Sequence, residues 1–381
     1  MQGFSRNYVQ WLAVLLAALW AGAVLADAGA GRAARIDRLM RAYQGEVPGA
    51  AVLVRRDGRV LFERAYGYAD LEAHRRVSPA TNFRLASMTK QFTAAAVLLL
   101  AQDGRLSLED PVRRWLPELP PATQPVRVRD LLTHVSGVID YEELIPAGMT
   151  QQLHDADVLR LLQAENRTYF VPGSQYRYSD SGYALLALIV ARAAHTSFAA
   201  FLQERIFAPL GMRGSVAYEA GVSQVRERAF GYRAVGSGWQ RDDQSLTSAV
   251  LGDGGVYSSV EDLARWDAAL YDARLLSDAT RAEAFSPLVS TEDPHVQYGF
   301  GWRITGETLW HSGETVGFRN VIVRFPRRHF TVIVLSNRDA PEPYDTALAI
   351  ARLYFSDAAA VRAAQVVVGP DSGAHPLPQA H

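Results

Sequence analysis

Strand-like runs lie at both ends of this chain of 381 residues, and helical patterns fill the middle. Near the start, residues 50–56 and 59–64 flank an Asp57-Gly58 pair that favours a tight hairpin turn. Strands at both ends with helices between them imply one antiparallel sheet formed from both chain ends, with an inserted helical lobe. We therefore predict an α+β fold. The late β-rich runs are residues 299–304, 308–311, 320–325 and 331–335, with a turn at 326–329.

Residues that interrupt the helical pattern mark the boundaries of the domain and of its two lobes. We expect one domain over residues 27–360, with a sheet lobe at about 36–85 and 290–355 and a helical lobe at about 86–289. Residues 27–35 are expected to form a loose lead-in. The predicted helices cover residues 36–43, 87–102, 128–134, 155–164, 181–195, 198–206, 259–271 and 344–355.

The first segment has the pattern of an export signal. Arg6 gives a positive start, residues 9–25 are almost wholly apolar, and Ala26 closes a small-residue cleavage site. We predict a signal peptide over residues 1–26 and a periplasmic or secreted protein with no stable membrane span after cleavage. An uncleaved anchor is the alternative, because the apolar run approaches the length that spans a bilayer. Residues 361–381 are expected to be a disordered tail.

Composition excludes several classes of function. The formal net charge of −1 gives no basic footprint, which argues against a nucleic-acid partner. The chain has no cysteine, so disulfides, cysteine-bound zinc and thiol catalysis are excluded. The nine histidines form no His-Glu-x-x-His pattern, and we expect neither a metal nor another cofactor.

Ser87 and Lys90 carry the strongest chemical signal. They are three residues apart at the start of an apolar segment, so on a helix both side chains lie on one face. Of the 39 lysines and arginines, only Lys90 is a lysine. Because arginine stays charged in proteins whereas a buried amine can lose its proton, the site that keeps lysine is a candidate for a base that activates a serine nucleophile. The alternative is a chance spacing.

Other candidate residues are ambiguous from spacing alone. Tyr178 precedes an apolar helix and could relay protons with Lys90, although most of the 16 tyrosines will be packed rings. Gly313 would let a substrate backbone lie close along the strand that ends at His311. His134 is best explained as part of a helix stop. A Ser-His-Asp triad with either histidine stays open, but no Gly-x-Ser-x-Gly motif surrounds a serine.

Three motifs in order carry a family resemblance. They are Ser87-Met88-Thr89-Lys90, Tyr178-Ser179-Asp180 and His311-Ser312-Gly313, and further landmarks are residues 131–137, 172–173 and 254–255. Together they resemble the serine β-lactamase and penicillin-binding-protein superfamily over about residues 36–355. The similarity points to the class C β-lactamase-related serine hydrolases, which include esterases, D-aminopeptidases and D-alanyl-D-alanine carboxypeptidases. It implies a β-lactamase/transpeptidase-like fold.

The resemblance also assigns roles to residues. It implies that Ser87 is acylated, that Lys90 and Tyr178 share the base and acid roles, and that backbone N–H groups of Ser87 and Glu314 form the oxyanion hole. The residues it places against the substrate are Asp180, His311, Ser312, Gly313 and Arg319.

Two positions depart from the lactamase pattern. Asp180 stands where that branch has Asn, and we expect it to add negative charge beside the substrate. His311 stands where that branch has Lys, and we expect a pH-dependent anchor for a substrate carboxylate. Arg319 is a candidate to replace the lost charge. Efficient β-lactam hydrolysis is therefore disfavoured.

These observations favour an exported serine hydrolase that cleaves an ester or a small peptide amide through an acyl-Ser87 intermediate. A β-lactamase or a D-alanyl-D-alanine carboxypeptidase is the alternative within the same class. A non-catalytic binding protein with the penicillin-recognising fold is the alternative from another class, and the presence of Ser87, Lys90 and Tyr178 argues against it.

Overall fold

The computed structural model of this chain describes residues 29–355. The expected signal peptide and the expected tail at 361–381 lie outside these residues. Two compact units are distinguished, Met1–Ala42 and Tyr43–His381. In the first unit residues 29–39 are helical, so the helix already includes part of the segment that we expected to be a loose lead-in.

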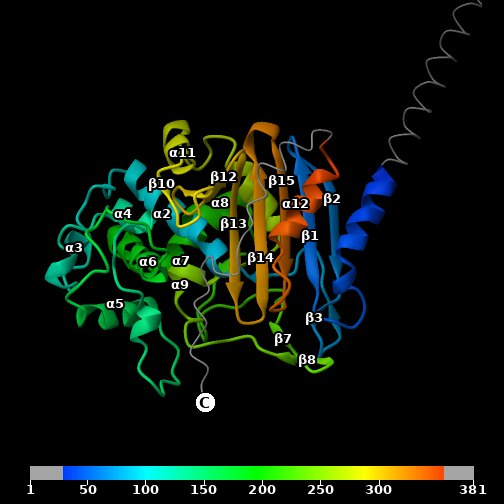
Figure 1. Cartoon of the computed structure of the whole chain (residues 1–381), viewed down its shortest axis with the longest axis horizontal. Coiled ribbons are helices and arrows are strands. Elements are labelled where there is room, and N and C mark those ends of the chain that lie inside the picture. The colour runs from blue at the N-terminus through cyan, green and yellow to red at the C-terminus, as the bar shows by residue number, and fades with distance from the viewer. Residues whose placement is uncertain (1–28, 356–381) are drawn as a thin grey trace, which may run out of the picture. The chain divides into compact units, whose positions relative to one another are not determined.

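An eight-stranded antiparallel sheet forms the centre of the second unit (Figure 1). The strand order is β10-β11-β12-β13-β14-β15-β1-β2, so β1 from early in the sequence pairs with β15 from late in it. This arrangement confirms the predicted α+β fold with a sheet formed from both chain ends. The strands are β1 (Ala50–Arg56), β2 (Arg59–Tyr66), β10 (Val289–Ser290), β11 (Gln297–Tyr298), β12 (Arg303–Thr305), β13 (Thr308–Thr315), β14 (Phe318–Phe325) and β15 (Phe330–Ser336).

Helices α2 to α11 lie between β5 and β10 in the sequence. Three small sheets, β3-β4, β5-β9-β6 and β7-β8, accompany the large one. The small strands are β3 (Tyr68–Asp70), β4 (Arg75–Arg76), β5 (Phe83–Arg84), β6 (Val216–Ala217), β7 (Tyr232–Val235), β8 (Gly238–Arg241) and β9 (Val256–Ser258). The α-helices are α2 (Lys90–Gln102), α3 (Val112–Trp115), α4 (Val128–Leu132), α5 (Asp155–Gln163), α6 (Asp180–Ala194), α7 (Phe198–Leu202), α8 (Ala208–Leu210), α9 (Leu251–Gly254), α10 (Val260–Ala269), α11 (Asp278–Ala284) and α12 (Tyr344–Arg352). Short 3₁₀ turns are η1 (Arg41–Tyr43), η2 (Ala86–Thr89), η3 (Pro121–Thr123), η4 (Tyr141–Leu144) and η6 (Pro326–Arg328), and η5 (Gln203–Phe207) is a π-helical turn.

Most predicted elements are present, with changes at their ends. Asp57 and Gly58 both have positive φ, as the tight turn between β1 and β2 requires. The helix predicted over residues 198–206 is interrupted by the π-helical turn η5. The strand predicted over residues 299–304 is wrong in its first half, because residues 299–302 form a loop in which Gly301 has φ +75°.

Helices cover both faces of the sheet. Arg324 of β14 lies beside Thr331 of β15, and both side chains hydrogen-bond to Asp267 of α10. Trp310 of β13 pairs with Val323, the residue before Arg324, so it points to the other face. There its ring lies 4.3 Å from that of Tyr344 in α12. Helices α10 and α12 therefore bury β14 and β15 from opposite sides.

Helix α2 is buried almost all round. Its residues from Lys90 to Leu100 are all inaccessible, because the segment is apolar on every side and packs among α6, α9 and the sheet. The lysine in its first turn is thereby placed in the interior next to the sheet.

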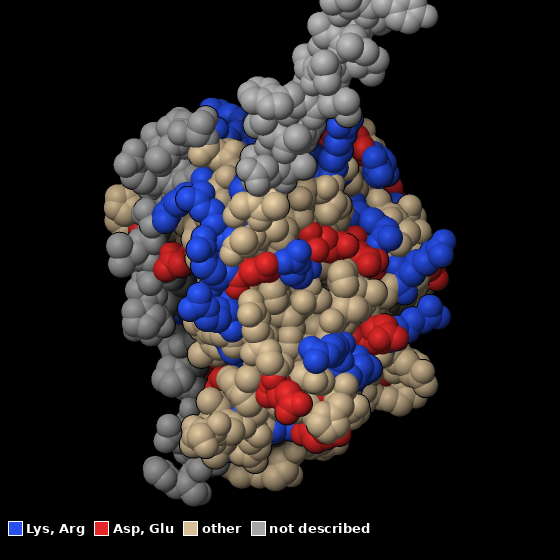
Figure 2. Space-filling view, turned by 90° about the vertical axis from the view of Figure 1, so that its right-hand side faces the viewer, with Lys and Arg blue, Asp and Glu red and all other residues tan. Residues whose placement is uncertain are grey.

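The surface and the helices add two observations. On the face shown in Figure 2, acidic and basic side chains of the described residues are interspersed. Within residues 29–355, no single helix is long and apolar enough to cross a bilayer. The bent pair Asp180–Ala194 and Phe198–Leu210, which meet at 77°, passes that test together by length and composition.

Candidate active site

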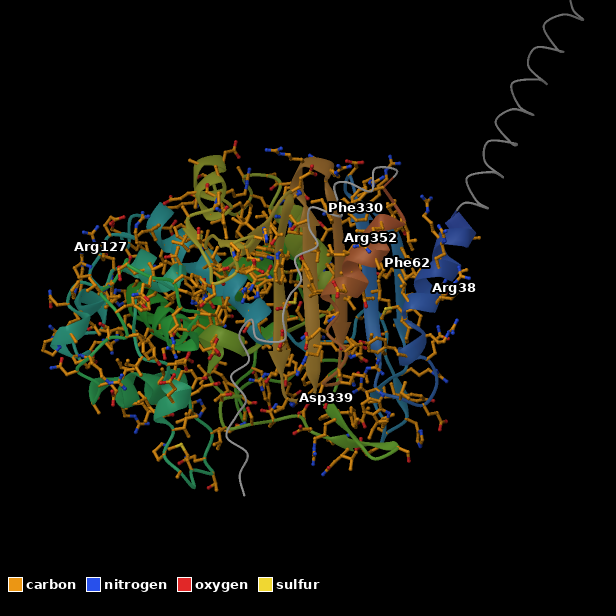
Figure 3. The ribbon with its side chains drawn as sticks, viewed as in Figure 1. Arg38, Phe62, Arg127, Phe330, Asp339 and Arg352 are labelled. Carbon is orange, nitrogen blue, oxygen red and sulfur yellow. The ribbon has the colours of Figure 1, made fainter. Side chains whose placement is uncertain are left out.

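A cavity of about 340 Å³ opens where the sheet meets the helical segments. It is lined by the turn between β13 and β14, by Ser87 and by Asp339. Phe330 and Asp339, both labelled in Figure 3, mark the two ends of the β15 region, so the cavity lies at the end where β15 finishes.

Ser87 lies on the short turn η2 between β5 and α2. The preceding Ala86 has φ +51°, a left-handed conformation that is unusual for a residue with a side chain. It bends the chain sharply from β5 into η2. The N–H of Leu85 donates to the carbonyl of Val256 in β9 at 2.8 Å, which fixes the entry to this turn.

Lys90 lies directly under Ser87. Its side chain is 0% exposed, and its Nζ lies 3.0 Å from the Ser87 Oγ, 2.5 Å from the Asp180 Oδ1 and 3.1 Å from the Asp253 carbonyl. Burial acts to lower the pKa of Lys90, but the charge of the Asp180 carboxylate, followed by interactions with Tyr178 and Asp253, holds that pKa above its ordinary value. The sequence favoured a neutral amine at this position, whereas the raised pKa and the three oxygen atoms around Nζ favour an ammonium.

Asp180 is the first residue of α6 and lines the cavity. We expected its carboxylate to add negative charge beside the substrate. That expectation is corrected, because the carboxylate forms the ion pair with Lys90 and its charge is balanced there.

Tyr178 lies at the centre of an aromatic group beside Lys90. The Lys90 Nζ lies 4.9 Å from the centroid of its ring, and the ring of His134 lies 4.3 Å away. The backbone N–H of Ser179 donates to Nδ1 of His134 at 3.2 Å. Burial, followed by the charge of Lys90, lowers the pKa of His134 well below its ordinary value, so a neutral imidazole supports the Tyr178 loop.

His311 is 1% exposed and closely bonded on both sides. Its Nδ1 lies 2.6 Å from the Ser312 carbonyl, which can only accept, so Nδ1 donates, and its Nε2 lies 3.0 Å from the Tyr298 hydroxyl. Burial, followed by the charge of Arg303, lowers the pKa of His311 well below its ordinary value. The lowered pKa disfavours the expected imidazolium anchor for a carboxylate near neutral pH.

Gly313 brings β13 against the turn that carries Ser87. A Cβ at this position would lie 1.9 Å from the carbonyl oxygen of Leu85, so only glycine permits the approach. The sequence assigned this close approach to a substrate, but the neighbour is the protein's own backbone. As a result Ser312 and Glu314 line the same cavity as Ser87.

Arg319 also lines the cavity, but its guanidinium is engaged. It pairs with Glu342 and donates to the carbonyls of Thr315 and Phe318 at 2.8 Å each. Burial and the neighbouring Glu314 raise the pKa of Glu342 to about 7.

Two cavity residues were missed by sequence reasoning. Arg303 of β12 is a buried cation whose guanidinium lies 5.3 Å from the centre of the Tyr178 ring, so a fixed positive charge lines the cavity without His311. Asp253 of α9 supplies a carbonyl to Lys90. With 38 arginines in the chain, no composition signal distinguishes Arg303, and a backbone carbonyl has no sequence signal at all.

Neither a metal site nor a histidine triad is formed in the described part of the chain. Residues 29–355 contain no group of three histidine or acidic side chains that could hold a metal. In the same residues Ser87 hydrogen-bonds to Lys90 and to no histidine. The Ser-His-Asp alternative therefore has no geometric support.

The β-lactamase family model matches residues 33–355. The chain belongs to the β-lactamase family. The match confirms the resemblance to the serine β-lactamase and penicillin-binding-protein superfamily, and it makes this β-lactamase-family chain a serine hydrolase of that superfamily.

Relatives of this β-lactamase-family chain include penicillin-binding proteins. It is 34% identical over 321 residues to Penicillin-binding protein 4* of Bacillus subtilis, which covers 78% of this chain and 70% of the relative. The crystal structure of a penicillin-binding protein from Bacillus halodurans is similar with a TM-score of 0.74 at 26% identity, over 84% of this chain and 99% of that one. D-amino acid amidase from Ochrobactrum anthropi shares the fold, with a TM-score of 0.72 at 23% identity over 85% of this chain and 100% of that one.

Proposed function

We propose that this chain is an exported serine hydrolase that cleaves an ester or a small peptide amide through an acyl-Ser87 intermediate. The observation that carries the proposal is the 3.0 Å contact between the Ser87 Oγ and the Lys90 Nζ inside a cavity of about 340 Å³. A cavity of this size fits a small substrate.

The proposed reaction has two halves. Ser87 Oγ attacks the substrate carbonyl while its proton leaves toward Lys90, and the oxyanion is bound by the backbone N–H groups of Ser87 and Glu314. Tyr178, which lies beside Lys90, donates a proton to the leaving alcohol or amine and is reprotonated from Lys90. Water then hydrolyses the acyl-Ser87 ester and restores the serine hydroxyl.

Intact-protein mass spectrometry after exposure to a fluorophosphonate tests this proposal. We expect one adduct, mapped to Ser87 by peptide analysis, and no adduct on the Ser87→Ala variant. An unlabelled wild-type protein would support the binding-protein alternative instead.

A β-lactamase or a D-alanyl-D-alanine carboxypeptidase is the second candidate. Arg303 favours it, because a buried guanidinium on the cavity wall could pair with the carboxylate that such substrates carry. A panel of p-nitrophenyl esters, D-amino-acid amides and nitrocefin separates the candidates. Turnover of nitrocefin above that of the esters would favour this second function.

A further inference from the structure

As an ammonium, Lys90 has no lone pair for the proton of Ser87. An ammonium has three N–H donors, and three acceptors lie within 3.1 Å of its nitrogen: Ser87 Oγ, Asp180 Oδ1 and the Asp253 carbonyl. No water reaches the side chain to exchange its protons, because the side chain is fully buried. Lys90 can accept a proton from Ser87 only if it gives one to another group.

Asp180 is the one acceptor of the three that can take that proton. The Asp253 contact is a backbone carbonyl, whereas Asp180 offers a carboxylate oxygen at 2.5 Å. We infer that Asp180 is the terminal proton acceptor for Ser87, reached through the Lys90 ammonium. This inference rests on the proposed function, in which Ser87 is the acylated residue.

The step balances as a relay of two protons. The Ser87 O–H bond breaks as Oγ bonds to the substrate carbonyl carbon, and its proton passes to Lys90. A Lys90 N–H bond breaks in the same movement, and that proton passes to the Asp180 carboxylate. The products are the tetrahedral adduct on Ser87, an unchanged ammonium and a neutral Asp180. When the leaving group departs with the proton of Tyr178, Asp180 returns its proton through Lys90 to the Tyr178 oxygen.

Other titratable groups surround the ion pair. Burial, followed by Asp180, raises the pKa of Asp140 to about 6 and that of Glu142 to about 8, and raises the pKa of Asp253. These three carboxyls hold protons at higher pH than ordinary ones. The remaining groups that face the pair are the hydroxyls of Tyr141, Tyr178 and Tyr183, the imidazoles of His134 and His311, and the guanidinium of Arg303.

The test measures the rate of Ser87 labelling by a fluorophosphonate between pH 6 and pH 10, in the wild type and in Asp180→Asn. At pH 7 we expect the variant to react about a hundredfold more slowly, the size of a lost general base. Its rate should then rise with pH, because without Asp180 burial lowers the pKa of Lys90 and frees a neutral amine. A variant with the wild-type rate and the wild-type pH profile would overturn the inference.

Glu142→Gln is the matched control, because it removes a carboxyl from the same cavity without touching Lys90. Its labelling rate should follow the wild-type rate and pH profile between pH 6 and pH 10. A control that reproduced the Asp180→Asn profile would assign the effect to cavity charge and overturn the relay.

The proton count can also be measured on the wild type alone, which removes any dependence on how a variant folds. In mixtures of light and heavy water, two moving protons predict a curved dependence of the labelling rate on the deuterium fraction. A straight line indicates a single transfer and overturns the relay. If the wild type is not labelled at all, the proposed function fails; if it is labelled and only these results fail, the inference alone is wrong.

Discussion

At the scale of single residues, the chemistry of the site depends on which charges are paired. Lys90 is charged although it is buried, because Asp180 and the Asp253 carbonyl face its nitrogen. Burial and the charge of Arg303 hold the pKa of His311 well below its ordinary value, although His311 stands where the lactamase branch has lysine. The sequence pattern favoured the opposite states, a neutral amine at Lys90 and an imidazolium at His311.

The first prediction concerns the lone lysine. Lys90→Arg keeps the positive charge, but guanidinium cannot pass a proton between Ser87 and Asp180. We expect kcat/KM to fall about a thousandfold, within the range of general acid–base catalysis. Steady-state kinetics on the preferred ester measures it, with circular dichroism as the folding control. Retention of more than a tenth of the activity would contradict the requirement for lysine.

The second prediction concerns His311. Because its pKa lies well below the ordinary value of 6.5, it stays neutral from pH 6 to pH 8 and contributes no titrating charge to the cavity. His311 should therefore cause no change over that pH range in the KM for a substrate that carries a carboxylate. A tenfold rise of KM between pH 6 and pH 8 that disappears in His311→Asn would show an imidazolium anchor after all.

The sequence could identify the residue types around the cavity but not their protonation. Spacing joined Ser87 to Lys90, and the order of motifs added Tyr178. The ionic state of Lys90 depends on Asp180 and Asp253, which reach it from α6 and α9 and have no local signal linking them to it. The protonation of Lys90 therefore depends on long-range contacts that residue spacing does not reveal.

At the scale of elements, close backbone approaches hold the cavity together. Gly313 lets β13 meet Leu85, and Gly301 lets the loop before β12 lie on Lys90, where a Cβ would be 2.8 Å from its carbonyl oxygen. The second contact also explains why a strand was wrongly predicted over residues 299–302. Local apolar pattern favoured a strand, and a tertiary contact with α2 required a positive φ instead.

Gly313→Ala tests the first approach. The new methyl group would meet the Leu85 carbonyl at 1.9 Å, so the backbone must shift, and we expect a loss of about 3 kcal/mol in the free energy of unfolding together with loss of activity. Gly238→Ala on β8 is the control, since its nearest neighbour would be 3.8 Å away. Urea unfolding compares the two, and equal costs would refute the steric explanation.

Helix α9 depends on one carboxylate. Asp155 accepts from the backbone N–H groups of Leu251 and Gly252 at 2.9 and 3.0 Å, and so fixes the helix whose Asp253 carbonyl contacts Lys90. Asp155→Ala leaves two buried donors without a partner. We expect a cost of about 2 to 3 kcal/mol in unfolding free energy and a loss of activity.

The control for this prediction is Asp157→Ala on α5, the helix that also carries Asp155. Asp157 accepts from the His154 N–H at 2.8 Å and caps only α5 itself. Its loss should cost about 1 kcal/mol and leave kcat unchanged. Equal kinetic effects of the two variants would disprove the link from α9 to the site.

At the scale of the whole molecule, raised carboxyl pKa values make stability depend on pH. Burial, followed by Asp180 and Asp140, raises the pKa of Glu142 from 4.5 to about 8. Between these values the unfolded chain is ionised while the native protein keeps the proton, so the native state binds more protons and stability falls as pH rises. Lys90 adds no slope here, because its contribution is complete below pH 10.5.

We therefore expect the free energy of unfolding to decrease by about 1 to 2 kcal/mol from pH 6.5 to pH 8, and to level off above that. Urea unfolding at three pH values measures the trend. Glu142→Gln should remove most of it, and a stability that increased with pH in the wild type would contradict the assignment.

The closure of the sheet by β1 and β15 has a consequence for how the protein is made. The serine is synthesised well before β13, the strand that seats against its turn at Gly313. A nascent chain that lacks β13 has the nucleophile without the wall of its cavity. We therefore expect no hydrolytic activity from the nascent chain until β13 has been synthesised and completes the cavity.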